Sequence, residues 1–291
     1  LPRLNAPITG LRFTMLPVPE FPLGGWGAGP GKATPNRVVT KKGPAYNHLL
    51  CGDILKLFAE IKQAFYKYSV LIFPGQDLTL EQHLAFSELF GPAERERTLD
   101  PKATPSRFNG AFADISNLAA DGKIWGETSR QRMYKEGNKL WHTDSSFKYK
   151  PGLCSLLYAT KVTPIGGFTE FADQRAAYDA LPPHMKARLE GLIAMHAIEY
   201  SRKRTGFFEF DPSEASRLPP VPQLLVRTIA QTKRKSLYVA SHIGAIKGMG
   251  AEEAEALVQQ LLAHVTQRQF TYIHRWRAND LVMWDNRCTL H

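Results

Sequence analysis

The chain has 291 residues, of which 43% are hydrophobic and 22% charged, and its formal net charge is +10. A chain of this length and composition can bury a large core, which excludes an intrinsically disordered protein. No apolar run reaches the roughly 18 residues of a membrane helix and no secretory signal pattern opens the sequence, so we expect a soluble, cytoplasmic protein. Cys51, Cys154 and Cys288 have no CxxC spacing, which argues against a disulfide framework or a zinc ribbon.

The positive net charge raises the question of a nucleic-acid partner. The basic residues are spread along the whole chain, without a dense basic arm and without a helix-turn-helix, zinc-finger or RNA-binding pattern. We therefore predict no nucleic-acid partner. The positive field favours small anionic ligands instead.

The first elements follow from glycine content and apolar spacing. Residues 1–47 are rich in glycine and proline, which predicts an irregular N-terminal segment before a single domain at 48–291. Apolar residues at helical spacing predict a helix over 54–65, and the run SVLIF predicts a strand over 69–73. The capping-box pattern that opens with Thr79 predicts a second helix, which ends at Phe90.

The second half of the chain is predicted to be mainly β. Residues 119–140 show no clean period and read as a lid-like loop. Strands are predicted at 153–162, 169–173, 223–230, 235–240, 270–276 and 281–286, with helices near 173–181, 183–196 and 251–265. Short strands that do not alternate with helices argue against a parallel sheet. The fold class that we predict is a jelly roll, or double-stranded β-helix, with flanking helices.

The stretch WHTDSSF carries the chemistry that the sequence suggests first. His142 and Asp144 are two residues apart, so on a strand both side chains would project from one face as half of a metal site. His291, at the end of LVMWDNRCTLH, supplies a third ligand on a last strand. Two histidines and a carboxylate form the facial triad of non-haem Fe(II) oxygenases, and the helical HExxH spacing of zinc hydrolases is absent. Asp144 could alternatively cap a turn with one of the two following serines.

Three segments resemble a known family. WHTDSSF, GGFTEFADQRAAYDALP and MWDNRCTLH are similar to segments of the 2-oxoglutarate-dependent dioxygenases typified by taurine dioxygenase and 2,4-dichlorophenoxyacetate dioxygenase, from about residue 69 onward. The resemblance implies Fe(II) bound by His142, Asp144 and His291, with 2-oxoglutarate and O₂ as cosubstrates. It also implies that Thr169 hydrogen-bonds a carboxylate of 2-oxoglutarate and that Asn138 lies near cosubstrate and substrate. The family places an arginine about ten residues beyond the last histidine, to bind the distal carboxylate of 2-oxoglutarate, whereas this sequence ends at the histidine.

The same resemblance implies an enzyme that hydroxylates a small anionic substrate, with release of succinate and CO₂. Aryloxyalkanoates, sulfonates and N-substituted amino acids all remain open, and members of the family commonly form homo-oligomers. Guanidinium groups bind carboxylates at two points, which makes basic residues candidates for substrate binding, although each could equally lie in a solvated loop. The candidates are Arg95, Arg97, Lys102, Arg130 and Arg132.

A second function class stays open at this point. The chain could be a non-catalytic basic binding protein on a degenerate jelly roll, and a steep salt dependence of its affinity for DNA or RNA would favour that interpretation. Other polar residues are interpreted as structural. Asp285 and Arg287 are expected to form an ion pair, and His196, His242 and His274 have no partner pattern.

Overall fold

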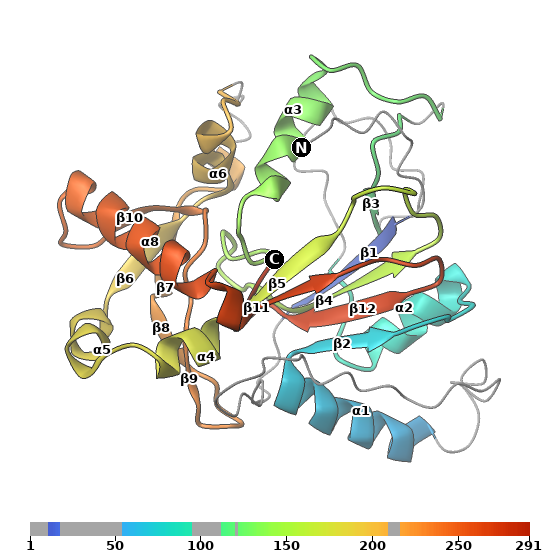
Figure 1. Ribbon diagram of the computed structural model, residues 1–291, viewed down its shortest axis with the longest axis horizontal. Helices are drawn as coiled ribbons and strands as arrows, with labels where there is room; N and C mark the ends of the chain where they lie inside the picture. Colours follow the sequence, from blue (N-terminus) through green and yellow to red (C-terminus); the bar gives the residue numbers. More distant parts are fainter. Residues whose placement is uncertain (1–10, 18–53, 95–111, 120–121, 209–215) are drawn as a thin grey trace.

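The structure is a computed structural model, which describes residues 11–17, 54–94, 112–119, 122–208 and 216–291. It is mainly β-sheet with flanking helices (Figure 1). The largest sheet has five antiparallel strands in the order β2-β12-β4-β1-β3. Their bounds are β1 Leu11–Pro17, β2 Val70–Phe73, β3 Ala113–Ile115, β4 Gly152–Ala159 and β12 Leu281–Asp285.

Three smaller antiparallel sheets form the rest of the described β structure. Their strand orders are β11-β5-β13, β10-β6-β7 and β8-β9. The bounds are β5 Thr169–Asp173, β6 Ile193–His196, β7 Val221–Leu224, β8 Val226–Thr228, β9 Lys235–Leu237, β10 Ile243–Ile246, β11 Thr271–His274 and β13 Thr289–Leu290. The chain leaves the large sheet after β12, turns at 286–288, and joins a different sheet as β13.

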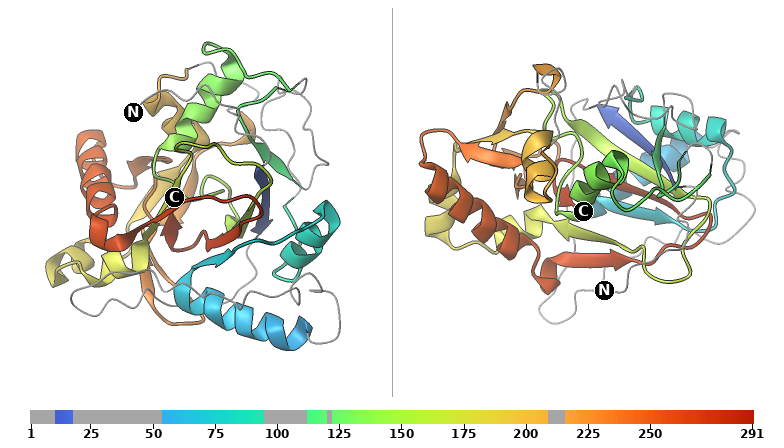
Figure 2. Two further views of the ribbon diagram at one scale, coloured as in Figure 1. Left: turned by 45° about the vertical axis from the view of Figure 1, so that its right-hand side comes forward. Right: turned by 90° about the horizontal axis from the view of Figure 1, so that it is seen from above.

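The helices lie around the sheets. Helices α1 and α2 flank the large sheet, α4, α5 and α8 lie beside the smaller sheets, and α3 and α6 lie near each other on a third side (Figures 1 and 2). The C-terminus lies near the middle of the molecule in all three views, between the large and the small sheets. The bounds are α1 Ile54–Tyr68, α2 Leu80–Glu88, α3 Arg130–Glu136, α4 Gln174–Asp179, α5 Pro183–Leu189, α6 Ile198–Arg204 and α8 Ala251–Val265, with 3₁₀ turns η2 Gly137–Lys139 and η3 Arg268–Phe270.

Apolar residues from two sheets pack together at the centre. The cluster includes Val70 of β2, Leu157 of β4 and Val282 of β12, together with Phe171 of β5 and Trp284 of β12. The rings of Phe171 and Trp284 have their centroids 5.4 Å apart, and both side chains are at most 1% exposed. This contact joins the large sheet to the sheet that contains the C-terminus.

Several sequence predictions are confirmed. A helix and a strand occupy the first two predicted positions as α1 and β2, and α8 matches its predicted range. The capping box of α2 is complete, because the Thr79 hydroxyl accepts from the Gln82 N–H at 3.2 Å and the Gln82 side chain accepts from the Thr79 N–H at 2.9 Å. Asp285 and Arg287 form the expected ion pair, with a shortest distance of 2.8 Å.

Among the described residues, none of the helices has the length and apolar character needed to cross a lipid bilayer.

Two predicted ranges differ from the observed secondary structure, because the sequence patterns that mark helices and strands are weak there. The range 119–140, predicted as a lid-like loop, contains α3 and η2. Because α3 has no buried residue, its sequence shows no apolar stripe, and the capping residue Ser129 is the one signal that marks where the helix begins. The helix predicted over 183–196 ends after α5, because Gly191 adopts a φ of +76° and the chain then continues as β6.

Three predicted strands also differ. WHTDSSF is not a strand: residues 144–147 form a turn, in which Ser145 has a φ of +56°. The range 223–230 is divided at Leu225 between β7 and β8, which belong to different sheets, and the last strand is divided into β12 and β13. Residues 11–17 form β1, inside the N-terminal segment that was expected to be irregular; the rest of that segment lies outside the described residues.

A buried ion pair between Asp173 and Arg175 lies at the junction between β5 and α4. Strand β13 pairs with β5 at this point, with Thr289 opposite Asp173. The carboxylate of Asp173 caps α4 by accepting from the Arg175 N–H and binds the Arg175 guanidinium at 2.9 and 3.0 Å, and both side chains are 0% exposed. We predict that Arg175→Met lowers the free energy of unfolding by about 3–5 kcal/mol, because it removes the cationic partner of a buried carboxylate. Chemical denaturation measures this change.

The matched control is Arg188→Met, which removes an ion pair to Glu253 between two side chains that are 44% and 60% exposed. We expect a change below about 1 kcal/mol there, because solvent screens the pair. Equal losses in the two variants would contradict the prediction.

Candidate metal centre

Two histidines and one carboxylate meet at the seam between the sheets. His142, Asp144 and His291 each offer a ligand atom, and these atoms all lie within 4.8 Å of one another. The Oδ1 atom of Asp144 is 3.8 Å from Nε2 of His142 and 3.7 Å from Nε2 of His291. Each of the three side chains is at most 13% exposed. The structure thus brings together all three ligands that the sequence predicted.

Backbone hydrogen bonds fix the two histidines relative to each other. The N–H of His142 donates to the carbonyl of His291 at 3.0 Å, and the N–H of His291 donates to the carbonyl of His142 at 2.9 Å. The Thr143 hydroxyl adds a bond at 2.6 Å to the carbonyl of Asn286, in the turn between β12 and β13. Together these bonds hold the end of the chain against the segment that carries the other two ligands.

The hydrogen bond made by Nδ1 of His142 determines the tautomer of this ring. Nδ1 of His142 lies 2.7 Å from the carbonyl oxygen of Leu140, which can only accept, so Nδ1 carries the proton. Nε2 therefore presents its lone pair toward Asp144, as a metal-bound histidine requires.

Asp144 is oriented by a chain of two hydrogen bonds. The Ser155 hydroxyl on β4 donates to Oδ2 of Asp144 at 2.6 Å, and the Asn286 amide donates to the Ser155 oxygen at 2.8 Å. This leaves Oδ1 facing the histidines. Partners of this kind, behind a ligand, fix its orientation and raise metal affinity.

Burial keeps the histidines neutral. The pKa of His142 is lowered to about 3 by burial first and by the neighbouring His291 second, and burial also lowers the pKa of His291 to about 3. Burial raises the pKa of Asp144, because nothing in the cluster compensates fully for a desolvated negative charge. A divalent cation supplies that compensation and binds neutral imidazole, so these residues fit Fe(II) or a similar metal ion.

The two residues implied as cofactor-binding lie on either side of this cluster. Thr169 is on the same face of β5 as Phe171, whose ring centroid is 6.3 Å from that of His291. Its hydroxyl oxygen accepts from the indole N–H of Trp276 at 2.9 Å, which leaves the hydroxyl proton available for an acceptor. Asn138 lies in η2, and its side-chain oxygen accepts from Arg202 at 2.7 Å. Their roles stay predictions.

The predicted substrate-binding cations are less well placed. The Arg130 guanidinium lies over the ring of Phe207 at 5.2 Å, and Arg132 forms an ion pair with Glu127 at 3.7 Å in a partly exposed position on α3. Arg95, Arg97 and Lys102 lie outside the described residues. A role in substrate binding stays a prediction for all five.

The sequence did not single out several polar residues beside the cluster. The His242 ring centroid is 5.7 Å from that of His142, and Nδ1 of His242 is 3.0 Å from the Ser201 hydroxyl. Arg202 follows Ser201 on α6, and its charge lowers the pKa of both His142 and His242. These residues come from α6 and the loop before β10, which carry no motif. Only their buried positions reveal them.

The comparisons with known proteins agree with this geometry. The family described as "Taurine catabolism dioxygenase TauD, TfdA family" matches residues 49–291, which is most of the chain. The chain belongs to this family. The expected family resemblance is thereby confirmed.

Members of the TauD/TfdA family with stated activities are similar over most of their length. The chain is 44% identical over 233 residues to "Alpha-ketoglutarate-dependent 2,4-dichlorophenoxyacetate dioxygenase" of Cupriavidus pinatubonensis, covering 80% of this chain and 81% of that protein. It is 38% identical over 240 residues to "(S)-phenoxypropionate/alpha-ketoglutarate-dioxygenase" of Sphingobium herbicidovorans, covering 80% and 78%. The crystal structure of AAD-2 in complex with Mn(II) and N-oxalylglycine superposes with a TM-score of 0.72 at 42% identity, covering 88% and 84%.

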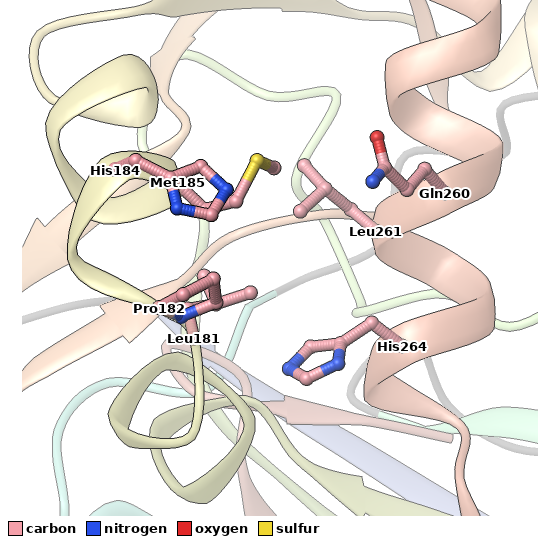
Figure 3. Close-up of a pocket in the computed structure, with 7 residues that line it drawn as sticks. All are labelled: Leu181, Pro182, His184, Met185, Gln260, Leu261 and His264. Atoms are coloured by element: carbon pink, nitrogen blue, oxygen red, sulfur yellow. The ribbon is translucent and has the colours of Figure 1, made fainter.

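A separate pocket lies between α5 and α8 (Figure 3). Leu181, Met185 and Leu261 line it together with Pro182, and Figure 3 shows the side chains of Met185 and Leu261 pointing toward each other across it. The lining includes His184, Gln260 and His264 but no acidic or strongly basic side chain and no residue of the metal cluster. We assign this pocket no part in the chemistry of the metal centre.

The orientation of Asp144 provides a test of the metal centre. We predict that Ser155→Ala lowers Fe(II) affinity by about 10- to 100-fold, because loss of a bond behind a ligand has effects of this size. Anaerobic titration with Fe(II) measures the affinity. The control is Ser236→Ala, a second buried strand serine, whose hydroxyl bonds only the neighbouring Leu237 carbonyl in this structure. Unchanged affinity in Ser155→Ala would contradict the assignment.

The buried histidines make the metal-free protein sensitive to acid. Burial lowers the pKa of His142, His196 and His291 to about 3, and that of His242 well below its usual value. Between about pH 6.5 and pH 3 the unfolded chain therefore binds more protons than the folded chain. Stability falls as the pH decreases through this window, by about 1.4 kcal/mol per pH unit for each histidine. The raised pKa of Asp144 acts in the opposite sense and offsets one histidine at most.

Urea unfolding with a chelator, at about pH 7 and about pH 5.5, measures this dependence. In His196→Gln the loss of stability between these two pH values should be smaller by about 1 kcal/mol, because one titrating group is removed, and a histidine in the unfolded chain is only partly protonated at pH 7. Equal stability of the wild-type protein at the two pH values would refute the prediction.

Proposed function

We propose that this protein hydroxylates an aryloxyalkanoate, with Fe(II) as the metal and 2-oxoglutarate and O₂ as cosubstrates. The observation that carries the proposal is the buried cluster of His142, Asp144 and His291, in which one carboxylate oxygen faces two neutral imidazole nitrogens. Three protein ligands leave positions for a cosubstrate and O₂ on a six-coordinate metal. Similarity to enzymes named for 2,4-dichlorophenoxyacetate and (S)-phenoxypropionate supports the substrate class.

Each residue around the metal centre has a separate proposed role. His142, Asp144 and His291 would hold Fe(II), which would supply the oxidation chemistry: one oxygen atom of O₂ enters succinate as 2-oxoglutarate loses CO₂, and the other converts a C–H bond of the substrate to C–OH. Thr169 donates its free hydroxyl proton to a carboxylate of 2-oxoglutarate. Phe171 and Trp284 pack against the ring of His291 and exclude water from that side of the metal.

We also propose that the sheets form the two layers of a double-stranded β-helix within residues 48–291. All strand pairs of the described residues are antiparallel. The passage from β12 to β13 moves the chain from one sheet to another at the metal centre, as this fold requires.

The test uses the full chain with Fe(II), 2-oxoglutarate, O₂ and 2,4-dichlorophenoxyacetate. We expect one succinate for each substrate molecule oxidised, and no product when any one component is omitted. Asp144→Ala should lose at least about 10³-fold in rate, because it removes a ligand from the metal. Asp77→Ala, which changes an exposed aspartate on the loop before α2, should keep wild-type activity.

The proposal fails if the wild-type protein consumes no 2-oxoglutarate with aryloxyalkanoates. Turnover with a sulfonate in their place would keep the cofactors and change the substrate class. Salt-dependent binding of DNA without any succinate would favour the non-catalytic alternative.

A further inference from the structure

The described interior contains buried guanidinium groups of two kinds. Arg175 and Arg287 each form two hydrogen bonds to the side chain of an aspartate. Arg202 is also buried, with 5% of its surface exposed, but no carboxylate of the described residues lies within 4.0 Å of its guanidinium. Burial lowers the pKa of Arg202, because its positive charge is desolvated without an anionic partner.

The contacts of Arg202 are neutral and incomplete. Its Nη2 donates to the side-chain oxygen of Asn138 at 2.7 Å, its Nη1 donates to the Ser201 hydroxyl at 3.3 Å, and the group lies over the ring of Tyr134 at 4.6 Å. Its Nε–H has no partner among the residues that the structure describes. A buried N–H without an acceptor costs about 1–3 kcal/mol and more when it is charged, so such a group calls for an explanation.

A short chain of contacts connects Arg202 to the metal centre. The Ser201 hydroxyl that accepts from Arg202 also lies 3.0 Å from Nδ1 of His242, and the ring of His242 packs against that of His142. Nε2 of His242 is buried and likewise has no partner in the described part of the chain. His242 therefore lies next to His142, and Arg202 is connected to His142 through Ser201 and His242.

Arg227 is a second largely buried arginine without a carboxylate partner among the described residues, and its surroundings differ. Arg227 lies over the ring of Tyr238 at 3.4 Å and donates to Gln223, and Gln223 donates to the carbonyls of Ser146 and Lys148. Arg227 thus supports the turn that follows Asp144. Arg202 supports no such turn, and its neighbours belong to α3 and η2.

We propose that Arg202 provides the positive charge that pairs with the carboxylate of the substrate. This inference rests on the proposed function, since it concerns the anionic substrate of that reaction. The carboxylate would bind between α6 and the segment 130–139, where Arg202 contacts Tyr134 and Asn138. Helix α3 has no fully buried residue, and a shift of this segment to admit a substrate would separate the ring of Tyr134 from that of Phe207.

The test compares an acid with its uncharged amide. The substrates are 2,4-dichlorophenoxyacetate and 2,4-dichlorophenoxyacetamide, and the variant is Arg202→Gln in the full chain. We expect kcat/KM for the acid to fall about 10²- to 10³-fold, as for the loss of one partner of a buried charge pair, with at most about a fivefold change for the amide. The KM for 2-oxoglutarate should stay within about twofold of wild type.

Arg204→Gln is the matched control. Arg204 is on the same helix, but its guanidinium already forms two hydrogen bonds at 2.6 Å to Glu255 at the surface. The ratio of kcat/KM for acid and amide should remain that of the wild type. Arg202→Lys keeps the positive charge and should retain most of the preference for the acid. If Arg202→Gln does not fold, the ratio of kcat/KM for acid and amide is measured in Arg202→Lys instead.

Three outcomes overturn the inference. The first is an equal loss of kcat/KM for acid and amide in Arg202→Gln, which indicates a structural role. The second is a selective rise in the KM for 2-oxoglutarate in the same variant. The third is loss of the preference for the acid in Arg202→Lys. A wild-type protein that oxidises neither compound and consumes no 2-oxoglutarate refutes the proposed function itself. An active wild type whose acid preference survives Arg202→Gln refutes only the inference.

Discussion

The metal centre depends on one reciprocal pair of backbone hydrogen bonds, between His142 and His291. The two residues are far apart in sequence, and neither lies within a long strand at this point. Side chains alternate between the two faces of a strand, so a shift of one residue in this pairing would turn the imidazole of His291 away from Asp144. The central apolar cluster fixes the pairing from the other side, because Phe171 and Trp284 both contact the His291 ring. Ligand geometry here is therefore a consequence of how the sheets join.

The charges around this seam are unbalanced in a way that matches the proposed chemistry. The histidines are neutral because burial disfavours their charged form, and Asp144 is the only carboxylate among the ligands. Arg202 and Arg227 are enclosed close by without carboxylate partners among the described residues. A folded protein tolerates such an excess of positive charge at a cost in stability, and anionic ligands offset it on binding. Stability is thus sacrificed at the place where the proposed substrate and cosubstrate, both anions, are to be held.

The sequence selected three residues that the structure brings together, but it predicted the chain around them less well. His142, Asp144 and His291 were predicted as ligands from residue type and family segments, whereas the segment WHTDSSF, expected to be a strand, forms a turn at 144–147. Periodicity detected α1 and α8 because each packs one apolar face on the core, and the capping box detected α2. It missed α3, which buries no residue, and also β6, which follows a glycine inside an apparently helical range. Arg202 and His242 carry no local pattern; their proximity to the metal centre is a property of tertiary structure alone.

Gly137 illustrates how closely the segment 130–139 fits the arginine beneath it. A methyl group at this position would lie 2.2 Å from Nη1 and 2.5 Å from Cδ of Arg202, although the φ of Gly137, −61°, is open to any residue. The limit on this position is therefore space and not backbone conformation. A side chain at 137 requires Arg202 either to take another position or to be replaced by a shorter residue. The two positions should vary as a pair among related sequences, and that covariation would be a record of this contact.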